Sequence, residues 1–387
     1  MRLAITRVLH LTAPGAALAL LGLTGATAAA AAAGVAGTAA PPPLAAPRVT
    51  VYVANQGSGT VTPIRVATNR PGRTINTHGA NSITATPDGR TVYVGSFGSQ
   101  DTVTPIRTAT NQAGRAIKVA GADDLLVTPD GKTLYAVGGL GDMTPVRVAT
   151  NMPGKTIKTG AAPFGPHSVA ITPNGKTLYL LNFLGGTVIP VRTAPNTVGK
   201  AIRVGTDPSA IAITPNGKTA YVANSGSGTV TPISTASGTA GPAIRVGADP
   251  SALVITPNGK TVYVANLASG TVTPIRAATN KAGRPIPVRV PGAMAITPDG
   301  KIVLVANFGG HTVTPVHTAT NKAGRPIRVG LGPIAIAITP NGRKAYVANF
   351  GNGRIEGHTV TPIRIATLRV GRAIKVGLDP IDLVIVH

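Results

Sequence analysis

The sequence contains no cysteine and no tryptophan, and it has only 12 acidic residues against 36 lysines and arginines. The absence of cysteine excludes disulfide bonds, thiolate catalysis and cysteine-bound zinc. Glu356 is the only glutamate, and no GxSxG, HExxH or calcium-loop pattern occurs, so any paired-carboxylate chemistry would depend on scattered aspartates. We therefore assign no catalytic residue, and we expect no metal and no cofactor.

Glycine and proline are abundant, with 48 and 34 residues, which favours a β-rich repeat protein with many turns. At the N-terminus, Arg2 and Arg7 precede an apolar stretch and then small residues, so residues 1–28 are predicted to be a secretory signal peptide. An uncleaved membrane anchor is the alternative. Residues 29–47 are mostly alanine, proline and glycine and are predicted to be a linker. We expect a secreted, cell-surface or periplasmic protein with no further membrane span.

Residues 48–387 form eight repeats of about 42 residues, and such a period is the mark of stacked or radial repeats. Each repeat holds four short apolar runs, for example Ser209–Thr214, Thr219–Asn224, Thr229–Ile233 and Ala243–Val246. Valine, isoleucine, threonine and tyrosine dominate the runs, and turn residues separate them, which indicates strands. Four antiparallel strands of this length form one blade of a β-propeller, and we label them A to D from the central channel outward.

Strand B recurs eight times, whereas the TP(D/N)G(K/R) turn that precedes it occurs only seven times. This mismatch predicts that the chain begins at strand B of blade one and that Pro380–His387 supplies the missing strand A. The predicted fold is an all-β, eight-bladed β-propeller of four-stranded antiparallel blades, closed by its C-terminal strand, with seven blades as the alternative. The same position of strand B holds tyrosine in seven repeats and Leu304 in the remaining one, which predicts core packing for all eight side chains.

The strand B motifs VYVAN (Val51–Asn55 and Val262–Asn266) and AYVAN (Ala220–Asn224), with the recurring ITPNGKT, resemble the YVTN-type β-propeller repeat family. The resemblance covers nearly all of residues 49–387. It implies an exported bacterial surface or periplasmic propeller. The motifs of that family are structural and carry no shared catalytic residue.

An antiparallel blade of four strands places its A-to-B and C-to-D connections on one face of the ring, which we name the basic face. The A-to-B turns contribute one cation each: Arg90, Lys132, Lys176, Lys218, Lys260, Lys301 and Arg343. Further arginines and lysines follow strand C, except in blade five, where Ser234 and Thr239 stand instead. Such a face is predicted to attract anionic polymers. Solubility and protection of the strand edges are the alternative.

The B-to-C and D-to-A connections lie on the opposite face, which we name the Phe/His face. The candidate ligand-binding residues there are Phe97, Phe164, His167, Phe183, Phe308, His311, Phe350 and His358. Aromatic walls with a few polar groups around a channel mouth suit a small-molecule or peptide site. The alternative is that phenylalanines following asparagine pack on the neighbouring blade and cap it.

These observations favour an exported, monomeric, non-enzymatic binding or scaffold module of the cell envelope. Its Phe/His face would hold a ligand or surface partner, and its basic face would lie against an anionic envelope polymer. An enzyme of the lactonase or lyase type at the channel mouth is one alternative. Nucleic acid binding by the basic face is another, although the aromatic side chains that stack bases lie on the other face.

Overall fold

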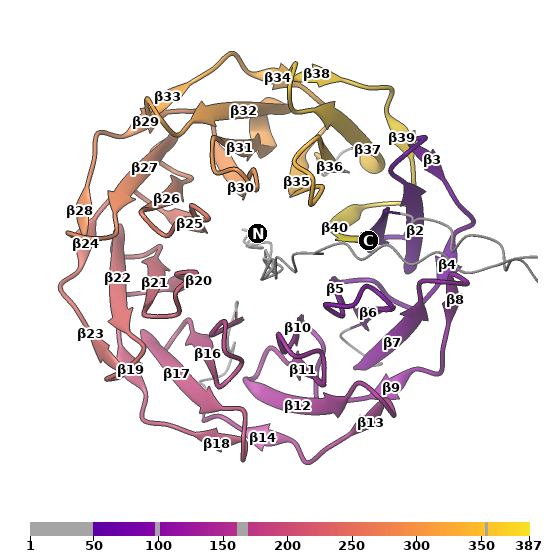
Figure 1. Ribbon diagram of the computed structural model, residues 1–387, viewed down its shortest axis with the longest axis horizontal. Helices are drawn as coiled ribbons and strands as arrows, with labels where there is room; N and C mark the ends of the chain where they lie inside the picture. The colour runs from indigo at the N-terminus through magenta and orange to yellow at the C-terminus, as the bar shows by residue number, and fades with distance from the viewer. Residues whose placement is uncertain (1–48, 97–100, 161–168, 353–354) are drawn as a thin grey trace, which may run out of the picture.

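The computed structural model describes residues 49–96, 101–160, 169–352 and 355–387. Eight antiparallel sheets stand radially around one axis, and Figure 1 shows them as the blades of a closed ring. The predicted all-β, eight-bladed propeller is confirmed, and the seven-bladed alternative is wrong. A single short 3₁₀ turn, η1 (Phe308–Gly310), is the only helical element in the described part of the chain.

Strands A and B form the inner half of every blade, from blade one to blade eight. Strands A are β40 (Pro380–Val386), β5 (Ser82–Ala85), β10 (Asp124–Val127), β15 (Val169–Ile171), β20 (Pro208–Ile213), β25 (Pro250–Ile255), β30 (Pro291–Ile296) and β35 (Pro333–Ile338). Strands B are β1 (Thr50–Asn55), β6 (Thr91–Ser96), β11 (Thr133–Val137), β16 (Thr177–Asn182), β21 (Thr219–Asn224), β26 (Thr261–Asn266), β31 (Ile302–Asn307) and β36 (Lys344–Gly351).

The outer strands follow in the same order of blades. Strands C are β2 (Thr60–Arg65), β7 (Thr102–Arg107), β12 (Asp142–Arg147), β17 (Thr187–Arg192), β22 (Thr229–Ser234), β27 (Thr271–Arg276), β32 (Thr312–His317) and β37 (Glu356–Arg364). The outermost position is shared by two short strands in every blade: β3 (Arg70–Pro71) and β4 (Ile75–Asn76), β8 (Gln112–Ala113) and β9 (Ile117–Lys118), β13 (Met152–Pro153) and β14 (Ile157–Lys158), β18 (Thr197–Val198) and β19 (Ile202–Arg203), β23 (Thr239–Ala240) and β24 (Ile244–Arg245), β28 (Lys281–Ala282) and β29 (Ile286–Pro287), β33 (Lys322–Ala323) and β34 (Ile327–Arg328), and β38 (Arg369–Val370) and β39 (Ile374–Lys375).

A proline in strand C explains why the outermost strand is interrupted. In blade five, the Pro232 carbonyl accepts a hydrogen bond from the Gly241 N–H at 2.7 Å, so this edge of Pro232 faces the outer strand. Proline has no N–H to donate in the same direction, and the pairing therefore stops and resumes on the far side of it. Gly241 passes so close that an added Cβ would lie 3.3 Å from the Pro232 side chain. Each blade thus ends in two short strands, which offer a poor template for further strand addition.

Blade one is completed by the two ends of the described chain. Strand β40 pairs antiparallel with β1 along its whole length, from Thr50 opposite Val386 to Asn55 opposite Pro380. In Figure 1 the yellow β40 lies beside the indigo strands of blade one. The predicted C-terminal closure is confirmed. It leaves no gap in the ring where a sheet edge could be exposed.

The seven strand B tyrosines are buried to 2% exposure or less, as predicted, and each one also reaches into the next blade. Tyr221, for example, packs in one hydrophobic cluster with Leu253 and Val262 of blade six. Its hydroxyl donates to Oδ1 of Asn280 at 2.7 Å, and Asn280 holds a left-handed backbone at φ 52° in the C-to-D loop of that blade. The same bond joins Tyr52 to Asn111, Tyr93 to Asn151, Tyr135 to Asn196, Tyr263 to Asn321 and Tyr346 to Asn69.

Two blade junctions lack this tyrosine–asparagine bond, and each lacks it for a visible reason. Gly238 stands in the asparagine position of blade five, and Tyr179 is left with the Thr235 carbonyl at 3.5 Å. At the junction of blades seven and eight, Leu304 replaces the tyrosine and Leu368 replaces the asparagine, and both leucines join one hydrophobic cluster. Leu368 keeps the left-handed backbone at φ 52°, which is unfavourable for a leucine. A polar pair has therefore been exchanged as a whole for an apolar one.

Deletion of Pro380–His387 should abolish the soluble fold, because it removes strand A of blade one and exposes the apolar edge of β1. We expect most of the protein in the insoluble fraction and no cooperative melting of the remainder. A chain starting at residue 48 is the control and should melt like the full chain. A deletion variant that melts within about 2 °C of its parent would contradict closure by β40.

Removal of a strand B tyrosine hydroxyl should lower the free energy of unfolding only where that hydroxyl donates a hydrogen bond to asparagine. We expect Tyr221→Phe to lower the free energy of unfolding by about 1 kcal/mol, the net value of one hydrogen bond. Tyr179→Phe is the matched control and should change it by less than about 0.5 kcal/mol, because its bond is long and weak. Urea unfolding followed by circular dichroism measures both. Equal losses in the two variants would show that the bond to asparagine contributes nothing.

Candidate functional site

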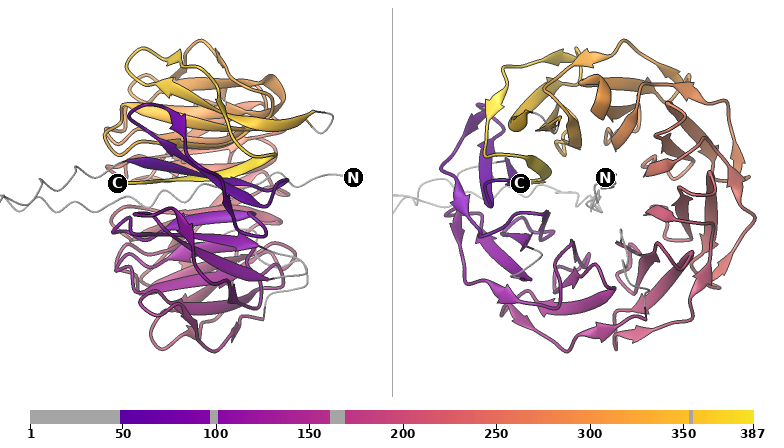
Figure 2. Two further views of the ribbon diagram at one scale, coloured as in Figure 1. Left: turned by 90° about the vertical axis from the view of Figure 1, so that its right-hand side faces the viewer. Right: turned by 180° about the vertical axis from the view of Figure 1, so that it is seen from behind.

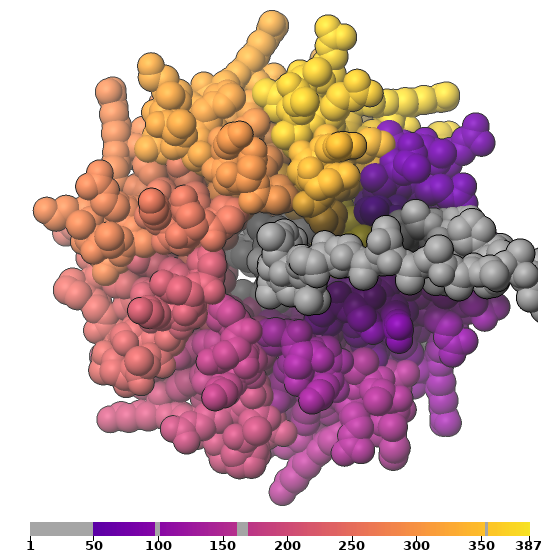
Figure 3. Space-filling model, viewed as in Figure 1, coloured from indigo at the N-terminus to yellow at the C-terminus, as the bar shows by residue number. Residues whose placement is uncertain are grey.

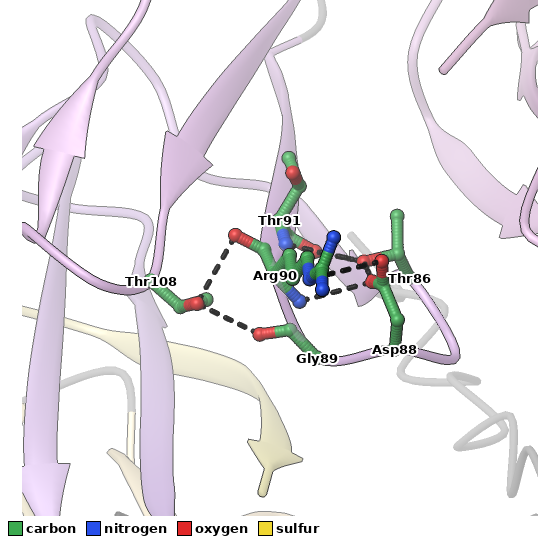
Figure 4. Close-up of polar contacts among 6 residues, drawn as sticks. All are labelled: Thr86, Asp88, Gly89, Arg90, Thr91 and Thr108. Atoms are coloured by element: carbon green, nitrogen blue, oxygen red, sulfur yellow. Dashed lines mark hydrogen bonds and ion pairs between the residues drawn. The ribbon is translucent and has the colours of Figure 1, made fainter. Parts of the chain in front are cut away.

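The strand register assigns the turns to the two faces as the sequence predicted. In blade two, Thr91 at the start of strand B lies opposite Arg107 at the end of strand C, so the A-to-B turn and the C-to-D loop adjoin. Figure 4 shows the two connections tied together, with the Thr108 hydroxyl donating to the Gly89 carbonyl at 2.7 Å. The C-terminal end of the chain lies on this basic face, because the His387 carbonyl abuts Gly89; it is at left in the first view of Figure 2.

The A-to-B turn is held by the aspartate or asparagine of its TP(D/N)G(K/R) motif rather than by the lysine or arginine. In blade two, Oδ1 of Asp88 accepts hydrogen bonds from the Thr86 hydroxyl at 2.6 Å and from the Arg90 N–H at 3.0 Å. Figure 4 shows both contacts. In blade five, Asn216 makes the same two contacts with Thr214 and Lys218. The cation that follows therefore points to solvent with no part in forming the turn.

All seven turn cations are exposed, and three of them share their turn with an aspartate. The side-chain distances are 3.8 Å for Arg90–Asp88, 4.0 Å for Lys132–Asp130 and 3.6 Å for Lys301–Asp299, with the cation side chains at least 80% exposed. Exposed pairs of this kind are weak and leave most of the field of the cation in place. The hydroxyl of Thr128 is the main cause that lowers the pKa of Asp130, so this aspartate stays ionised at neutral pH.

The remaining four turns carry asparagine, and three of them are consecutive around the ring. Lys176, Lys218 and Lys260 in blades four, five and six follow Asn174, Asn216 and Asn258, respectively. No acidic residue lies in these three turns. Among the A-to-B turns of the basic face, this arc therefore keeps its positive charge with the least neutralisation by aspartate. Figure 3 views the ring along its axis, and long side chains extend from its rim.

The Phe/His face gathers fewer of its predicted residues into a site. Phe97, Phe164 and His167 lie outside the described residues. Phe308 and Phe350 are half-buried and pack against the hydrophobic cluster that blades eight, one and two share. Phe183 is half-buried in blade four, across the ring. These contacts favour blade capping over a shared aromatic pocket.

The two candidate histidines of this face that the structure describes have separate roles. Nδ1 of His311 accepts the Gly332 N–H at 3.1 Å, which ties a blade-seven turn to the loop that enters blade eight. His358 is exposed at the end of the long β36–β37 hairpin. Within residues 49–96, 101–160, 169–352 and 355–387, no three histidine or acidic side chains lie close enough together to hold a metal ion.

Two aspartates on the innermost strands, and a third just before one of them, are polar residues that the sequence analysis did not single out. Asp382 of blade one and Asp124 of blade three occupy the position that Ala210 and Ala252 hold in blades five and six. Asp123 precedes Asp124 and accepts the Gly139 N–H at 2.6 Å. Alignment of the strand A runs, rather than of the loops alone, would have found all three.

No helix in the described ranges combines the length and apolar character needed to cross a bilayer. A family model described as "Lactonase, 7-bladed beta-propeller" matches residues 126–284, which is less than half of the chain. A search of curated proteins returns no match.

The solved structures that align with this chain share little sequence with it. The dihydro-heme d1 dehydrogenase NirN, in complex with DHE, aligns with a TM-score of 0.74 at 15% identity over 87% of this chain and 74% of its own. Hydrazine synthase of Kuenenia stuttgartiensis aligns at 0.56 and 23% over 78% and 96%. A protein of unknown function from Desulfotomaculum acetoxidans DSM 771 aligns at 0.61 and 19% over 87% and 99%. At these identities the likeness supports the fold alone.

Replacement of Phe350 by serine should destabilise the protein by roughly 1 to 3 kcal/mol through lost apolar burial. Leu184→Ser on the same face is the control, because Leu184 is 54% exposed and should be nearly neutral. Thermal melting of both variants makes the comparison. If Phe350→Ser melted like its parent, the phenyl side chain of Phe350 would not cap the blade and would be available to a ligand.

Proposed function

We propose that this protein is a non-enzymatic binding module of the cell envelope that attaches through its basic face to an anionic envelope polymer. The Phe/His face is then directed away from the polymer and is free to meet a ligand or surface partner. The seven exposed cations of the A-to-B turns carry the proposal, because threonine and aspartate or asparagine hold these turns and at most a weak exposed ion pair engages the charge.

The distribution of acidic residues supports this orientation. Asp88, Asp130 and Asp299 are the acids of the A-to-B turns, whereas Asp101, Asp142, Asp207, Asp249 and Glu356 lie in B-to-C and D-to-A connections or at the strand ends beside them, on the Phe/His side. A molecule with cations gathered on one face turns that face toward a polyanion as it approaches. The two faces are thus unequal in charge, and the attraction is directional.

Nucleic acid is a less suitable polyanion for this surface. Stacking of bases requires exposed aromatic rings among the cations. The described tyrosines are buried between blades, and the described phenylalanines lie on the Phe/His face. Electrophoretic retention of DNA should therefore be weak and vanish at moderate salt, whereas that of the envelope polymer persists further.

The triple variant Lys176→Gln, Lys218→Gln and Lys260→Gln should bind immobilised teichoic acid more weakly than its parent, with an unchanged melting temperature. Parent binding should itself fall as salt rises from 0.1 to 1 M, because the screening length shrinks from about 10 Å to about 3 Å. The salt concentration that elutes each protein from the polymer is the measurement.

A matched control removes three positive charges from the outermost strands instead of from the A-to-B turns. Arg203, Arg245 and Arg328 are exposed on the outermost strands, at the ends that face the Phe/His side. Their replacement by glutamine should shift elution much less than the lysine triple variant does. Equal shifts would mean that net charge alone governs retention, and the proposal for the basic face would fail.

Lactone hydrolysis is the second candidate, because a lactonase family model matches residues 126–284. Within the described part of that range, Asp130 forms a turn and Asp142 pairs with Lys158 at 2.6 Å. Asp207 and Asp249 hold left-handed loop positions. Hydrolysis of sugar lactones, monitored by the protons it releases, tests this candidate. Turnover that is lost in Asp124→Asn or Asp382→Asn but kept in Asp130→Asn would favour it.

A further inference from the structure

One sector of the basic face breaks the pattern of the others. In blade six the C-to-D loop runs from Arg276 to Lys281, and Arg284 follows. The equivalent positions of blade five are Ser234, Thr239 and Pro242, none of which is charged. Every other blade carries arginine, lysine or histidine at one or more of these places. Blade five therefore forms a neutral gap in the outer part of the cation ring.

The gap is rich in hydroxyl groups rather than merely uncharged. Oγ of Ser237 and Oγ1 of Thr239 lie 2.7 Å apart, and both residues are exposed. Since a hydroxyl offers one donor and two acceptor sites, this pair keeps capacity for further hydrogen bonds. Gly238 between them has a left-handed backbone with no atom within 4 Å of an added Cβ, so the space above the loop is open.

The loop also lacks one bond that most of its counterparts have. Tyr179 of blade four finds no asparagine here and contacts the Thr235 carbonyl at 3.5 Å. As at Thr108, Thr193 and Thr318 of other blades, the Thr235 hydroxyl fixes the base of the loop by donating to a turn glycine, here to the Gly217 carbonyl at 2.5 Å. The base is thus anchored, and the Gly238 N–H also donates to the Ser234 carbonyl at 2.8 Å. The side chains of Ser237 and Thr239 remain exposed at the tip, where a ligand can reach them.

Cations border this sector on three sides. Lys218 lies in the A-to-B turn of the same blade, next to Thr219, which pairs with Ser234. In the neighbouring blades, Arg192 ends strand C of blade four and Arg276 ends strand C of blade six. Strand β23 lies beside β19, and β24 lies beside β28, so the three blades are in contact at the rim.

We infer that the Ser237–Thr239 sector receives the neutral, hydroxyl-bearing unit of a phosphodiester polymer that contains sugars or polyols, while phosphates bind the bordering cations. The inference rests on the proposed binding of an anionic polymer by the basic face. A phosphate placed over the C-to-D loop of blade five would find no cation within that loop, whereas a sugar or polyol would find hydroxyl partners there. Eight nearly equal blades would let a polymer bind in any position around the ring. The sector in blade five favours the position in which a neutral unit lies over it.

The test converts blade five into a copy of its neighbour. Ser234→Arg with Thr239→Lys introduces the residues that blade six carries at the same positions. The control variant, Gln112→Lys with Met152→Lys, adds two cations at the Thr239 position of blades two and three. Both variants place side chains that other blades already accommodate, and circular dichroism checks their folds.

The probes are inorganic polyphosphate, which has no hydroxyl-bearing unit, and poly(glycerol phosphate). In the blade-five variant, the ratio of the two affinities should shift toward polyphosphate by about fivefold, the effect of one lost hydrogen bond. In the control variant, both affinities should rise together and the ratio should stay constant. Equal ratio shifts in the two variants would overturn the inference while leaving polyanion binding intact. No binding of either polymer by the parent would instead overturn the proposed function.

Discussion

The contact of each strand B tyrosine with the following blade is the interaction on which the ring depends. Blades of a propeller share no backbone hydrogen bonds in their outer parts, so side chains must set the spacing between them. A buried phenol fills the gap between two sheets, and its hydroxyl fixes a left-handed asparagine in the next C-to-D loop. The same bond therefore sets both the packing of the blades and the position of the loops that carry cations.

This arrangement separates the fold from the surface chemistry. Threonine and aspartate or asparagine shape the A-to-B turns, glycine and proline shape the outer strands, and tyrosine and asparagine join the blades. Lysine and arginine take part in few of these contacts. Lys344 is an exception, because its Nζ donates to the Val66 carbonyl at 2.6 Å across the junction of blades eight and one. Elsewhere on the basic face, charge can change without a change in structure.

The sequence allowed the ring and its two faces to be predicted, because repeat length and strand alternation are local properties. The excess of strand B runs over turns even located the closure at Pro380–His387. The interrupted outer strand follows from a known rule for proline in sheets, yet it went unpredicted because Pro232 lies inside a run of strand-forming residues. The tyrosine–asparagine bond could not be foreseen, since its partners are separated by 58 to 61 residues in cases such as Tyr93–Asn151 and Tyr135–Asn196.

The repeat unit of the sequence and the bonding unit of the structure are out of phase. A tyrosine and its asparagine belong to different repeats, so exchange of a single repeat alters two junctions at once. The pair Leu304 and Leu368 shows that both halves of a junction can change together, whereas Tyr179 remains where Gly238 has replaced the asparagine. When blades are duplicated or lost, both new junctions keep their tyrosine–asparagine bond only if the neighbouring repeats carry matching residues. A divergent blade such as the fifth can therefore persist only while the blade before it tolerates a tyrosine without an asparagine partner.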